Sequence, residues 1–522
     1  MGGTDMKRFV NNQKGFSIVI VLMLLALLMI LGFAAISMAN NQTRMVSIHQ
    51  QREQALQYAE AGIHRYMAEL SRDPNFYATT ASSDMQDIDT VYEDGYFRIS
   101  CSDPSIDNPY IILTSTGWHK NSEFKRTVEI KLQKKDLLQN AITTNTGSDV
   151  LWYTNRYIRG DRIYGPLHIN GNLIVSGKVG DNFAGGEGGP RFYGKVTYSG
   201  NYIVEPGSWF AVDTTWYNPE YNTVDGAVKP EKVPATGMYS MNENLKLEAD
   251  SDYIFQGRTC IYLNGTSMTI RNKNGSSVTK TIPENGIIYV KGNTGNNKWG
   301  LETANVFISG VLEGRLTIAA ENDIYITAGD PTDWSQPSTT APSTGGVTYS
   351  DLVGKTFTPE NAESLMADCN DMLGLVANRN IRILHYNWPK GDGDYYWKRS
   401  LITHYDVAPY NINVHAAAAA VTGSFEYEEH RDGPKKGDVT IVGSIIQNRT
   451  GPLAGYSVNF ADLDNFFDIP DPLHDRLSGY GRTFVHDPRM MYESPPSFAG
   501  PKHSGWEMVE WQEVSNPVVA EP

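Results

Sequence analysis

The sequence predicts an α+β protein in which a long N-terminal helix and a small antiparallel sheet precede a large all-β domain of the β-solenoid type. Three observations support this prediction. An uncharged apolar stretch from Phe16 to Ala39 is continued by a helical pattern to about residue 72. Strand-like runs follow up to residue 135. Beyond that point, short apolar runs alternate with glycine or asparagine turns.

Composition limits the class of protein. A chain of 522 residues is too long for one ordinary core, and 48 glycines, 29 tyrosines and 10 tryptophans favour β structure with many turns. The formal charge of −15 argues against nucleic-acid binding by the whole surface and leaves only local basic patches. The cysteines Cys101, Cys260 and Cys369 lack CxxC spacing, so we expect at most one disulfide, no metal and no cofactor.

The first half of the helix, residues 16–39, is long enough to cross roughly 30 Å of hydrocarbon. Lys7, Arg8 and Lys14 precede it, so we expect the N-terminus inside the cytoplasmic membrane and the rest of the chain outside. The apolar run is too long for an ordinary signal peptide. The sequence therefore predicts a single-pass protein that exposes most of its mass outside the cytoplasm.

The second half of the helix, up to residue 72, has an apolar face and a polar face. Its apolar residues recur at three- and four-residue intervals. They are Ala55, Leu56, Ala59, Ile63, Tyr66, Met67 and Leu70. The pattern ends at Asp73-Pro74, a pair that stops helices. We expect this apolar stripe to be covered by a sheet.

Two motifs in this helix resemble those of a known family. Lys14-Gly15-Phe16-Ser17 followed by the apolar helix resembles the cleavage site of a type IV prepilin. This resemblance implies that residues 1–15 are a leader, that a prepilin peptidase cuts between Gly15 and Phe16, and that it methylates Phe16. The stretch QALQYAEAG, residues 54–62, resembles the corresponding segment of PilX-type minor pilins. The alternative is a plain signal anchor, which needs neither motif.

One position departs from the family pattern. Most major pilins carry a glutamate at the fifth mature position, and this chain has Ile20 there. In the family that carboxylate is thought to neutralise the N-terminal amine of a neighbouring subunit within an apolar filament core, where an unpaired charge is costly. Its absence resembles minor subunits at a filament tip.

The segment 73–135 is expected to form the antiparallel sheet of a pilin-like module. Its runs 96–102, 110–116 and 124–132 are typical of strands, and the last alternates strictly between apolar and charged residues. We interpret Gly117, with Asn121-Ser122, as a turn between strands.

The segment 136–500 is predicted to be a β-solenoid, because its short strands are separated by single glycines, as in 167–177 and 306–318. A β-sandwich is the alternative, since the repeat length is irregular. Five alanines within 414–425 favour a narrow coil interior. The overall layout is similar to that of ComZ-type minor pilins, and residues 501–522 are expected to form a C-terminal strand and tail.

No catalytic site is predicted. His404 and Asp406, His474-Asp475 and His486-Asp487 place an imidazole beside a carboxylate, yet no nucleophile context accompanies them. We interpret them as structural or surface pairs. Asp392-Gly393-Asp394 lacks the further ligands of a calcium loop and is expected to be a turn.

One patch interleaves aromatic rings with cationic groups over a short stretch, which suits stacking on sugars or bases. Its members are Trp388, Lys390, Tyr395, Tyr396, Trp397, Lys398 and Arg399. We predict that these residues contact a ligand. The alternative is an aromatic loop that packs against the coils.

The sequence thus suggests a minor pilin of a type IV pilus, placed at the tip, with an exposed solenoid for adhesion, ligand binding or assembly priming. Its expected partners are other pilins and minor pilins, the prepilin peptidase, the cytoplasmic membrane before assembly, and an extracellular polysaccharide or DNA. Two alternatives stay open: a membrane-anchored solenoid enzyme acting on polysaccharide, and a static envelope protein.

Overall fold

The computed structural model describes residues 13–145, 156–157, 161–176, 191–205, 231–235, 242–333, 344–355, 357–358, 361–386, 406–456, 476–498 and 505–514. The chain divides into two compact units. Unit 1 comprises Met1–Asp103, Tyr110–Gln133 and Trp506–Pro522, and unit 2 comprises Pro104–Pro109 and Lys134–Gly505. Each unit is described by itself.

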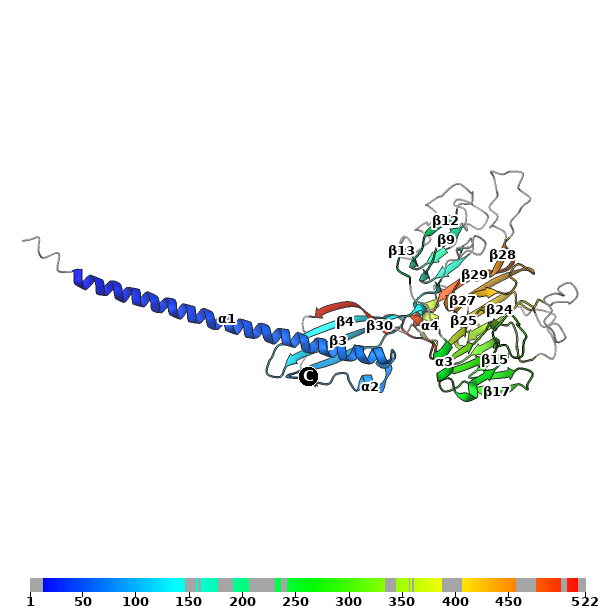
Figure 1. The fold of residues 1–522 in the computed structure, drawn as a ribbon, viewed down its shortest axis with the longest axis horizontal. Coiled ribbons are helices and arrows are strands. Elements are labelled where there is room, and N and C mark those ends of the chain that lie inside the picture. The colour runs from blue at the N-terminus through cyan, green and yellow to red at the C-terminus, as the bar shows by residue number, and fades with distance from the viewer. Residues whose placement is uncertain are drawn as a thin grey trace, which may run out of the picture. The chain divides into compact units, whose positions relative to one another are not determined.

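Unit 1 consists of one long helix and a five-stranded sheet (Figure 1). Helix α1 (Gln13–Arg72) lies with its C-terminal part against the sheet, mainly on β3. The strands are β1 (Thr90–Tyr92), β2 (Gly95–Ser102), β3 (Tyr110–His119), β4 (Lys125–Lys135) and β30 (Gly505–Val514). Two short helices, η2 (Phe76–Ala78) and α2 (Thr80–Ser83), connect α1 to the sheet. The predicted helix and the predicted antiparallel strands are therefore confirmed.

The sheet buries one face against the helix, as the alternation in the sequence requires. Val128, Ile130 and Leu132 of β4 are fully buried, and the residues between them are partly exposed. Ile63 and Tyr66 of α1 pack into the same core.

The fifth strand of this sheet comes from the far end of the chain. The order of strands is β1-β2-β3-β4-β30, so β30 lies beside β4 although residues 136–504 separate them in sequence. Arg126 contacts Glu513 and Glu129 contacts Gln512, so residue numbers fall along β30 as they rise along β4. The two strands are therefore antiparallel, and unit 2 is an insertion between neighbouring strands of unit 1.

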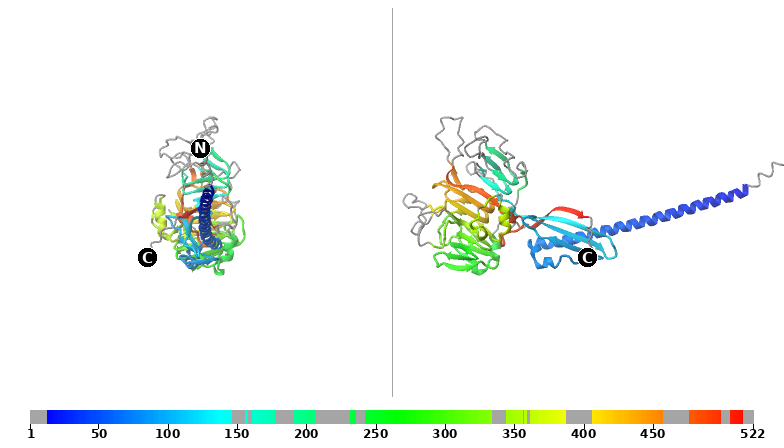
Figure 2. Two further views of the ribbon diagram at one scale, coloured as in Figure 1. Left: turned by 90° about the vertical axis from the view of Figure 1, so that its left-hand side faces the viewer. Right: turned by 180° about the vertical axis from the view of Figure 1, so that it is seen from behind.

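Unit 2 is almost entirely β structure, with a 22-stranded sheet and a three-stranded sheet (Figures 1 and 2). Its strands are β5 (Ile142–Thr144), β6 (Arg156–Tyr157), β7 (Arg162–Tyr164), β8 (Leu167–Ile169), β9 (Leu173–Ser176), β10 (Arg191–Tyr193), β11 (Val196–Tyr198), β12 (Tyr202–Glu205), β13 (Glu231–Lys232), β14 (Ile254–Gln256), β15 (Thr259–Gly265), β16 (Ser267–Asn272), β17 (Val278–Thr281), β18 (Ile287–Lys291), β19 (Val306–Leu312), β20 (Arg315–Ala320), β21 (Ile324–Ile326), β22 (Thr344–Tyr349), β23 (Met372–Ala377), β24 (Ile381–Ile383), β25 (Asn411–Ala420), β26 (Phe425–Tyr427), β27 (Lys435–Gln447), β28 (Ala454–Tyr456) and β29 (Arg476–His486). Its short helices are η3 (Leu137–Gln139), α3 (Asn242–Glu248), η6 (Ser251–Tyr253), η7 (Ser350–Leu352), α4 (Ala362–Ala367) and η11 (Pro488–Met491).

The strands of unit 2 pair mostly in parallel. Within the described residues, the antiparallel pairs of named strands are β15–β16, β16–β17 and β28–β29. Every other recorded pair is parallel, for example β25 with β27 and β20 with β23. Parallel neighbours require a crossover between them, so successive stretches of chain are stacked on one another.

The order of strands in this stack is not the order of the chain. From β14 to β29 the chain adds strands in sequence, ending with β27 beside β29. The first strands of the unit then continue the stack, because β5 pairs with β27 and β7 pairs with β29. The beginning and the end of unit 2 therefore meet in the middle of the stack. His486 Nε2 lies 2.7 Å from the carbonyl oxygen of Leu138, and Ser444 donates to Asn140.

This order explains how a long stack is inserted into a small sheet. A stack built from one end to the other has its termini far apart, whereas an insertion between neighbouring strands needs them close together. Because the chain enters and leaves unit 2 in the middle of the stack, the two ends of the unit lie close together. The sequence predicted the mostly β character of the unit but not this order, because local patterns carry no information about which distant strands pair.

A 29-residue repeat is present at the start of unit 2. Arg162 pairs with Arg191 and Leu167 pairs with Val196, so each residue faces the one 29 positions later. The two copies share the patterns Arg-x-Tyr-Gly and Gly-Asn-x-Ile-Val, and the rings of Tyr164 and Tyr193 stack at 4.3 Å. Comparing the sequence with itself would have revealed this repeat.

The alanine run of β25 is buried on both faces. Ala416, Ala418 and Ala420 belong to the large inner core, as the predicted narrow interior requires. Ala417 and Ala419 point the other way, into a second core that contains Leu137 and Phe498. The small side chains therefore reflect two covered faces, and the prediction that assigned all five to the interior was incomplete.

Candidate functional site

The exposed first half of α1 is the largest apolar surface in the described part of the chain. The helix from Ser17 onward is long and apolar enough to cross a membrane, with mean hydropathy 3.1, and none of its most apolar stretch is buried. Between Phe16 and Glu53 the sequence has no acidic residue. Ile20, at the departing position, is 46% exposed. Gly15 and Phe16, the predicted processing residues, fall near the start of α1.

The second half of α1 lies unusually close to the sheet, because small residues face each other. A Cβ added at Gly117 would lie 2.2 Å from the backbone nitrogen of Ala59 and 2.4 Å from the carbonyl oxygen of Ala55. A Cβ added at Gly62 would lie 2.4 Å from Ser115 Oγ. The Ala-Glu-Ala-Gly segment therefore provides the surface on which strand β3 rests.

A third glycine contact completes this surface. A Cβ added at Gly95 of β2 would lie 2.3 Å from the ring of Tyr58, whose burial raises its pKa. Gly117, predicted to lie in a turn, lies inside β3, which continues to His119. A glycine inside a strand often marks a close backbone approach, and this signal was available in the sequence.

The predicted ligand-contact residues, from Trp388 to Arg399, lie outside the described residues. The structure does describe the two positions that flank this segment. Tyr386 and Asp406 form an isolated antiparallel bridge, so the segment leaves and rejoins unit 2 at one place. The assignment of ligand contact to these residues stays a prediction.

The base of this segment is a buried group of charged and aromatic side chains. His385 is fully buried, stacks on Tyr386 at 3.8 Å and lies 3.7 Å from Asp406 Oδ2. Lys436 donates to the same carboxylate at 2.8 Å. Although burial acts to raise the pKa of Asp406, the nearby His385 and Lys436 side chains lower it overall. The base is thus held by an ionised carboxylate.

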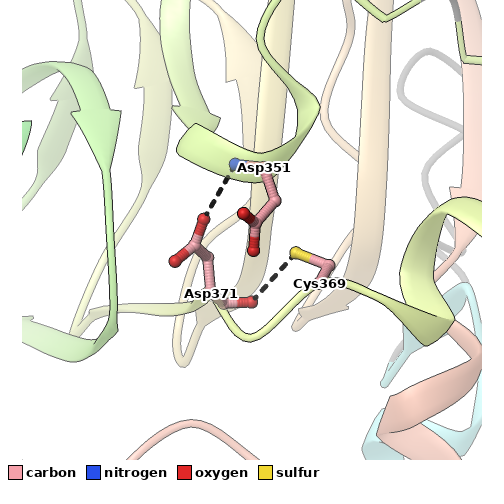
Figure 3. Close-up of side chains that lie close together, drawn as sticks. All are labelled: Asp351, Cys369 and Asp371. Carbon is pink, nitrogen blue, oxygen red and sulfur yellow. Dashed lines mark hydrogen bonds between the residues drawn. The ribbon is translucent and has the colours of Figure 1, made fainter.

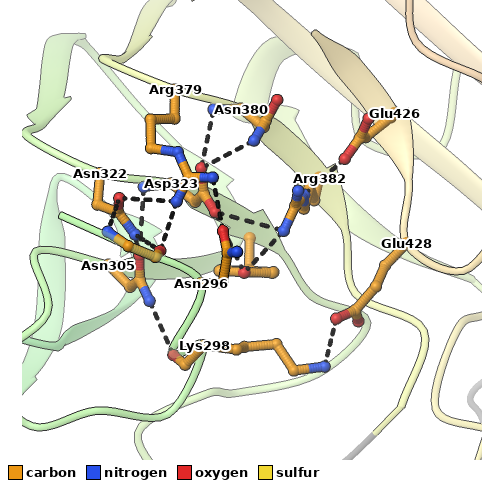
Figure 4. Close-up of polar contacts among 12 residues, drawn as sticks. Asn296, Lys298, Asn305, Asn322, Asp323, Arg379, Asn380, Arg382, Glu426 and Glu428 are labelled. Carbon is orange, nitrogen blue, oxygen red and sulfur yellow. Dashed lines mark hydrogen bonds and ion pairs between the residues drawn. The ribbon is translucent and has the colours of Figure 1, made fainter. Parts of the chain in front are cut away.

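A polar network lies next to this base, at the starts of successive strands of the stack (Figure 4). Asn322 donates to Asn305 Oδ1 at 2.6 Å, and Asp323 accepts two hydrogen bonds from Asn380. Arg382 is paired with Asp323 and with Glu426. These amide and carboxylate groups satisfy one another and the turns between strands, so the network has a structural role.

Asp351, Cys369 and Asp371 place three potential metal ligands close together (Figure 3). Their atoms are already engaged: Asp371 accepts from the backbone of Gly314 and Asp351, and Asp351 accepts from the backbone of Asn370. Burial raises the pKa of the Cys369 thiol to about 11, which keeps the sulfur protonated and a poor ligand. The arrangement fits a turn better than a metal site.

Of the predicted histidine–aspartate pairs, the structure describes His486-Asp487 and Asp406 and leaves His404, His474 and Asp475 outside the described residues. His486 is buried, and its burial lowers its pKa. Asp487 pairs with Arg489, which also donates to the carbonyl oxygens of Cys369 and Asp371. Both residues therefore fasten the segment after β29 to the stack and are structural, as predicted.

Comparison with known proteins supports the interpretation of the N-terminal helix as pilin-like. Residues 14–64 match the family model described as PilX N-terminal. No curated protein matches the chain. Among solved structures, the crystal structure of the competence-associated pilin ComZ from Thermus thermophilus is similar, with 12% identity, a TM-score of 0.28, and coverage of 89% of this chain and 97% of that one. The family match carries the assignment: the chain has a PilX-type pilin N-terminus followed by a large β unit.

Proposed function

We propose that this chain is a minor pilin that enters a type IV pilus at its tip and exposes unit 2 there as a binding domain. The observation that carries the proposal is the combination of a PilX-type N-terminus with an insertion between two strands of the same sheet. The helix supplies the means of assembly. The insertion supplies a surface that an ordinary filament subunit lacks.

Assembly begins with processing between Gly15 and Phe16. Cutting there removes Lys7, Arg8 and Lys14, the charges that hold the N-terminus at the cytoplasmic face of the membrane. The exposed apolar helix can then leave the lipid only by packing against similar helices of other pilins. An N-methylated Phe16 in the mass spectrum of the mature protein is the expected result, and an intact leader in cells with an active prepilin peptidase would contradict it.

Two features support placement at the tip. Unit 2 would collide with its neighbours if it were repeated at every step of a closely packed filament, whereas the tip leaves room for it. Ile20 also lacks the carboxylate that would neutralise the amine of an adjacent subunit. A tip subunit has no neighbour on one side, so the loss is tolerated there.

Unit 2 acts as a binding domain for an extracellular polymer rather than as an enzyme. The charged and aromatic clusters that the structure describes are engaged in holding turns and strands together. The segment from Trp388 to Arg399 is the proposed contact region, and its target is a polysaccharide or DNA.

Labelling tests the placement. Leu247 is 84% exposed and Leu245 is fully buried, so Leu247→Cys and Leu245→Cys form a matched pair for maleimide–gold labelling of intact pili. Cys260 and Cys369 are buried and should not react, and the half-buried Cys101 is replaced by serine in both variants. We expect gold from Leu247→Cys at filament ends and background labelling from Leu245→Cys. Gold spread along the shafts would overturn the tip placement, and gold confined to cell bodies would indicate a plain anchored protein.

A further inference from the structure

The edge of β4 is completed by the last described strand of the chain. Without β30, strand β4 would be an edge strand with an unpaired row of backbone groups. Residues 505–514, which pair with this edge, are synthesised only after the whole of unit 2. This separation makes β30 comparable to a peptide that adds itself to the edge of a sheet.

Side chains at both ends of β30 fix its position. Near its start, Trp506 Nε1 donates to the carbonyl oxygen of Pro74 at 2.8 Å, and the Trp506 ring meets the Tyr77 ring edge-on at 5.6 Å. Near its end, Glu513 pairs with Arg126 of β4. Both ends therefore carry contacts that a strand of arbitrary sequence would not make.

Arg126 links three elements of unit 1. It pairs with Glu53 of helix α1 at 3.3 Å as well as with Glu513 of β30. Hydrogen bonding from Arg126 is the main cause that lowers the pKa of Glu513, so this carboxylate is ionised in the pair. Gln512 adds a contact of 2.6 Å to Glu129 on β4. The guanidinium thus recognises β30 together with the helix.

The middle of β30 is held mainly by its backbone. Met508, Val509 and Trp511 are 39%, 49% and 46% exposed, so no large apolar side chain in this stretch is buried. A strand held by backbone hydrogen bonds and by contacts at its two ends can pair late and reversibly. It differs from β3, which lies under helix α1 and whose Ile111 and Leu113 are fully buried.

We propose that the edge of β4 is a strand-binding site specific for residues 505–514, and that its occupation closes unit 1 only after the rest of the chain has been exported. The export direction rests on the proposed function, but the binding site does not. A chain that lacks its C-terminus would keep an open edge. Closure by β30 therefore reports that unit 2 has been exported before the protein joins a filament.

The test uses the full chain in detergent, with a protease site inserted between Phe498 and Gly505. After cleavage, residues 505–522 are held only by non-covalent contacts. Retention of this fragment through gel filtration supports the site. The same sample is then mixed with an excess of a fluorescent peptide of residues 505–522, and amide exchange of β4 is followed by mass spectrometry. β25 of unit 2 serves as the internal reference.

Three outcomes decide the proposal. If the fragment is retained, or if it leaves and the fluorescent peptide binds and restores protection of β4, the site exists. If the fragment leaves and the peptide does not bind, the proposal is overturned. It is also overturned if β4 stays equally protected after the fragment has left. None of these measurements involves a pilus, so failure here is distinct from failure of the tip placement.

Peptide variants separate side-chain recognition from simple strand addition. We expect Trp506→Ala and Glu513→Gln each to weaken peptide binding about tenfold. Glu510→Gln is the matched control, because it changes a carboxylate of the same strand that makes no described contact with β4. Equal binding of all these peptides would show that the edge accepts any extended chain, and the proposed specificity would then be wrong.

Discussion

Units 1 and 2 use the same small residues for opposite purposes. In unit 1, Gly62 of helix α1 lies against Ser115 of β3, and Gly117 of β3 lies against the backbone of α1, so each glycine allows the opposite element to approach. In unit 2, Gly443 lies within strand β27 and has a φ of +144°. The carbonyl oxygen of Ala416, on the neighbouring strand, occupies the place that a Cβ would take. One unit uses glycine to bring a helix onto a sheet, and the other uses it at a positive φ to let two paired strands approach closely.

The two units also differ in how many faces of a strand are buried. β4 of unit 1 buries one face and shows a strict alternation of apolar and charged residues. β25 and β27 of unit 2 are buried on both faces over their last seven residues, so the sequences there do not alternate between apolar and charged residues. The comparison shows that alternation of apolar and polar residues identifies a strand only where one of its faces is exposed to solvent.

The largest expected effect tests the role of glycine in unit 2. Gly443→Ala should destabilise this unit by about 4 kcal/mol, because it adds backbone strain of roughly 1–3 kcal/mol to an overlap costing about as much. The added Cβ would lie 2.0 Å from the carbonyl oxygen of Ala416. Amide exchange of β25 and β27 measures the loss.

The control for this variant is Gly295→Ala. Gly295 has a similar φ of +151°, but a Cβ there meets nothing within 4 Å. It therefore reports the backbone strain alone. If both variants lose the same stability, the close approach to Ala416 has no energetic weight. Exchange in unit 1 should be unchanged in either variant, and a change there would mean that the units do not unfold separately.

The second prediction concerns the close contact between helix α1 and strand β3 in unit 1. Gly117→Ala should destabilise this unit by about 3 kcal/mol, because the new methyl group overlaps backbone atoms of α1 that cannot move alone. Amide exchange of β3 measures the loss. Gly32→Ala, where a Cβ meets nothing within 4 Å, is the control and should have no such effect. A stable Gly117→Ala protein would mean that the helix can shift without cost.

The third effect is a pH dependence of unit 2. Burial lowers the pKa of His415 to about 4, whereas an unfolded histidine titrates near 6.5. The unfolded chain therefore binds more protons below pH 6.5. The stability due to neutral His415 is complete above that pH and is lost as the pH falls toward 4. At pH 5 the loss is roughly 2 kcal/mol.

His415→Gln isolates this contribution. Glutamine can still accept the hydrogen bond from the backbone of Tyr349 but does not titrate. The variant should show a smaller decrease in the melting temperature of unit 2 between pH 7 and pH 5. An identical decrease in both proteins would assign the acid sensitivity to other groups, such as His486, whose pKa is also lowered by burial.

The sequence predicted unit 1 in detail because its signals are local. The helix was expected over 16–72 and spans Gln13–Arg72, and the strand expected over 96–102 is β2. Apolar spacing and alternation determine such elements within a few residues. The partner of the C-terminal strand was not predicted, since nothing in residues 505–514 indicates a pairing with a strand that lies before unit 2.

In unit 2 the β character was predictable, but the arrangement was not. Its short strands were identified from glycine and asparagine turns, as at Gly171-Asn172. The entry in the middle of the stack depends on β5 pairing with β27, a contact between residues about 300 positions apart. The clusters around Asp371 and Asn380 were also missed, because each assembles side chains from separate strands.

The antiparallel pairing of β4 with β30 has a mechanical consequence. The chain leaves unit 1 at Gln133 and returns at Trp506, so two of the covalent connections between the units lie at the same end of two neighbouring strands. A mechanical load on unit 2 would therefore be passed to two strands that are held in different ways. β4 buries Val128, Ile130 and Leu132 in the core that it shares with helix α1, whereas β30 is held by its pairing with β4 and by side-chain contacts such as that of Glu513 with Arg126.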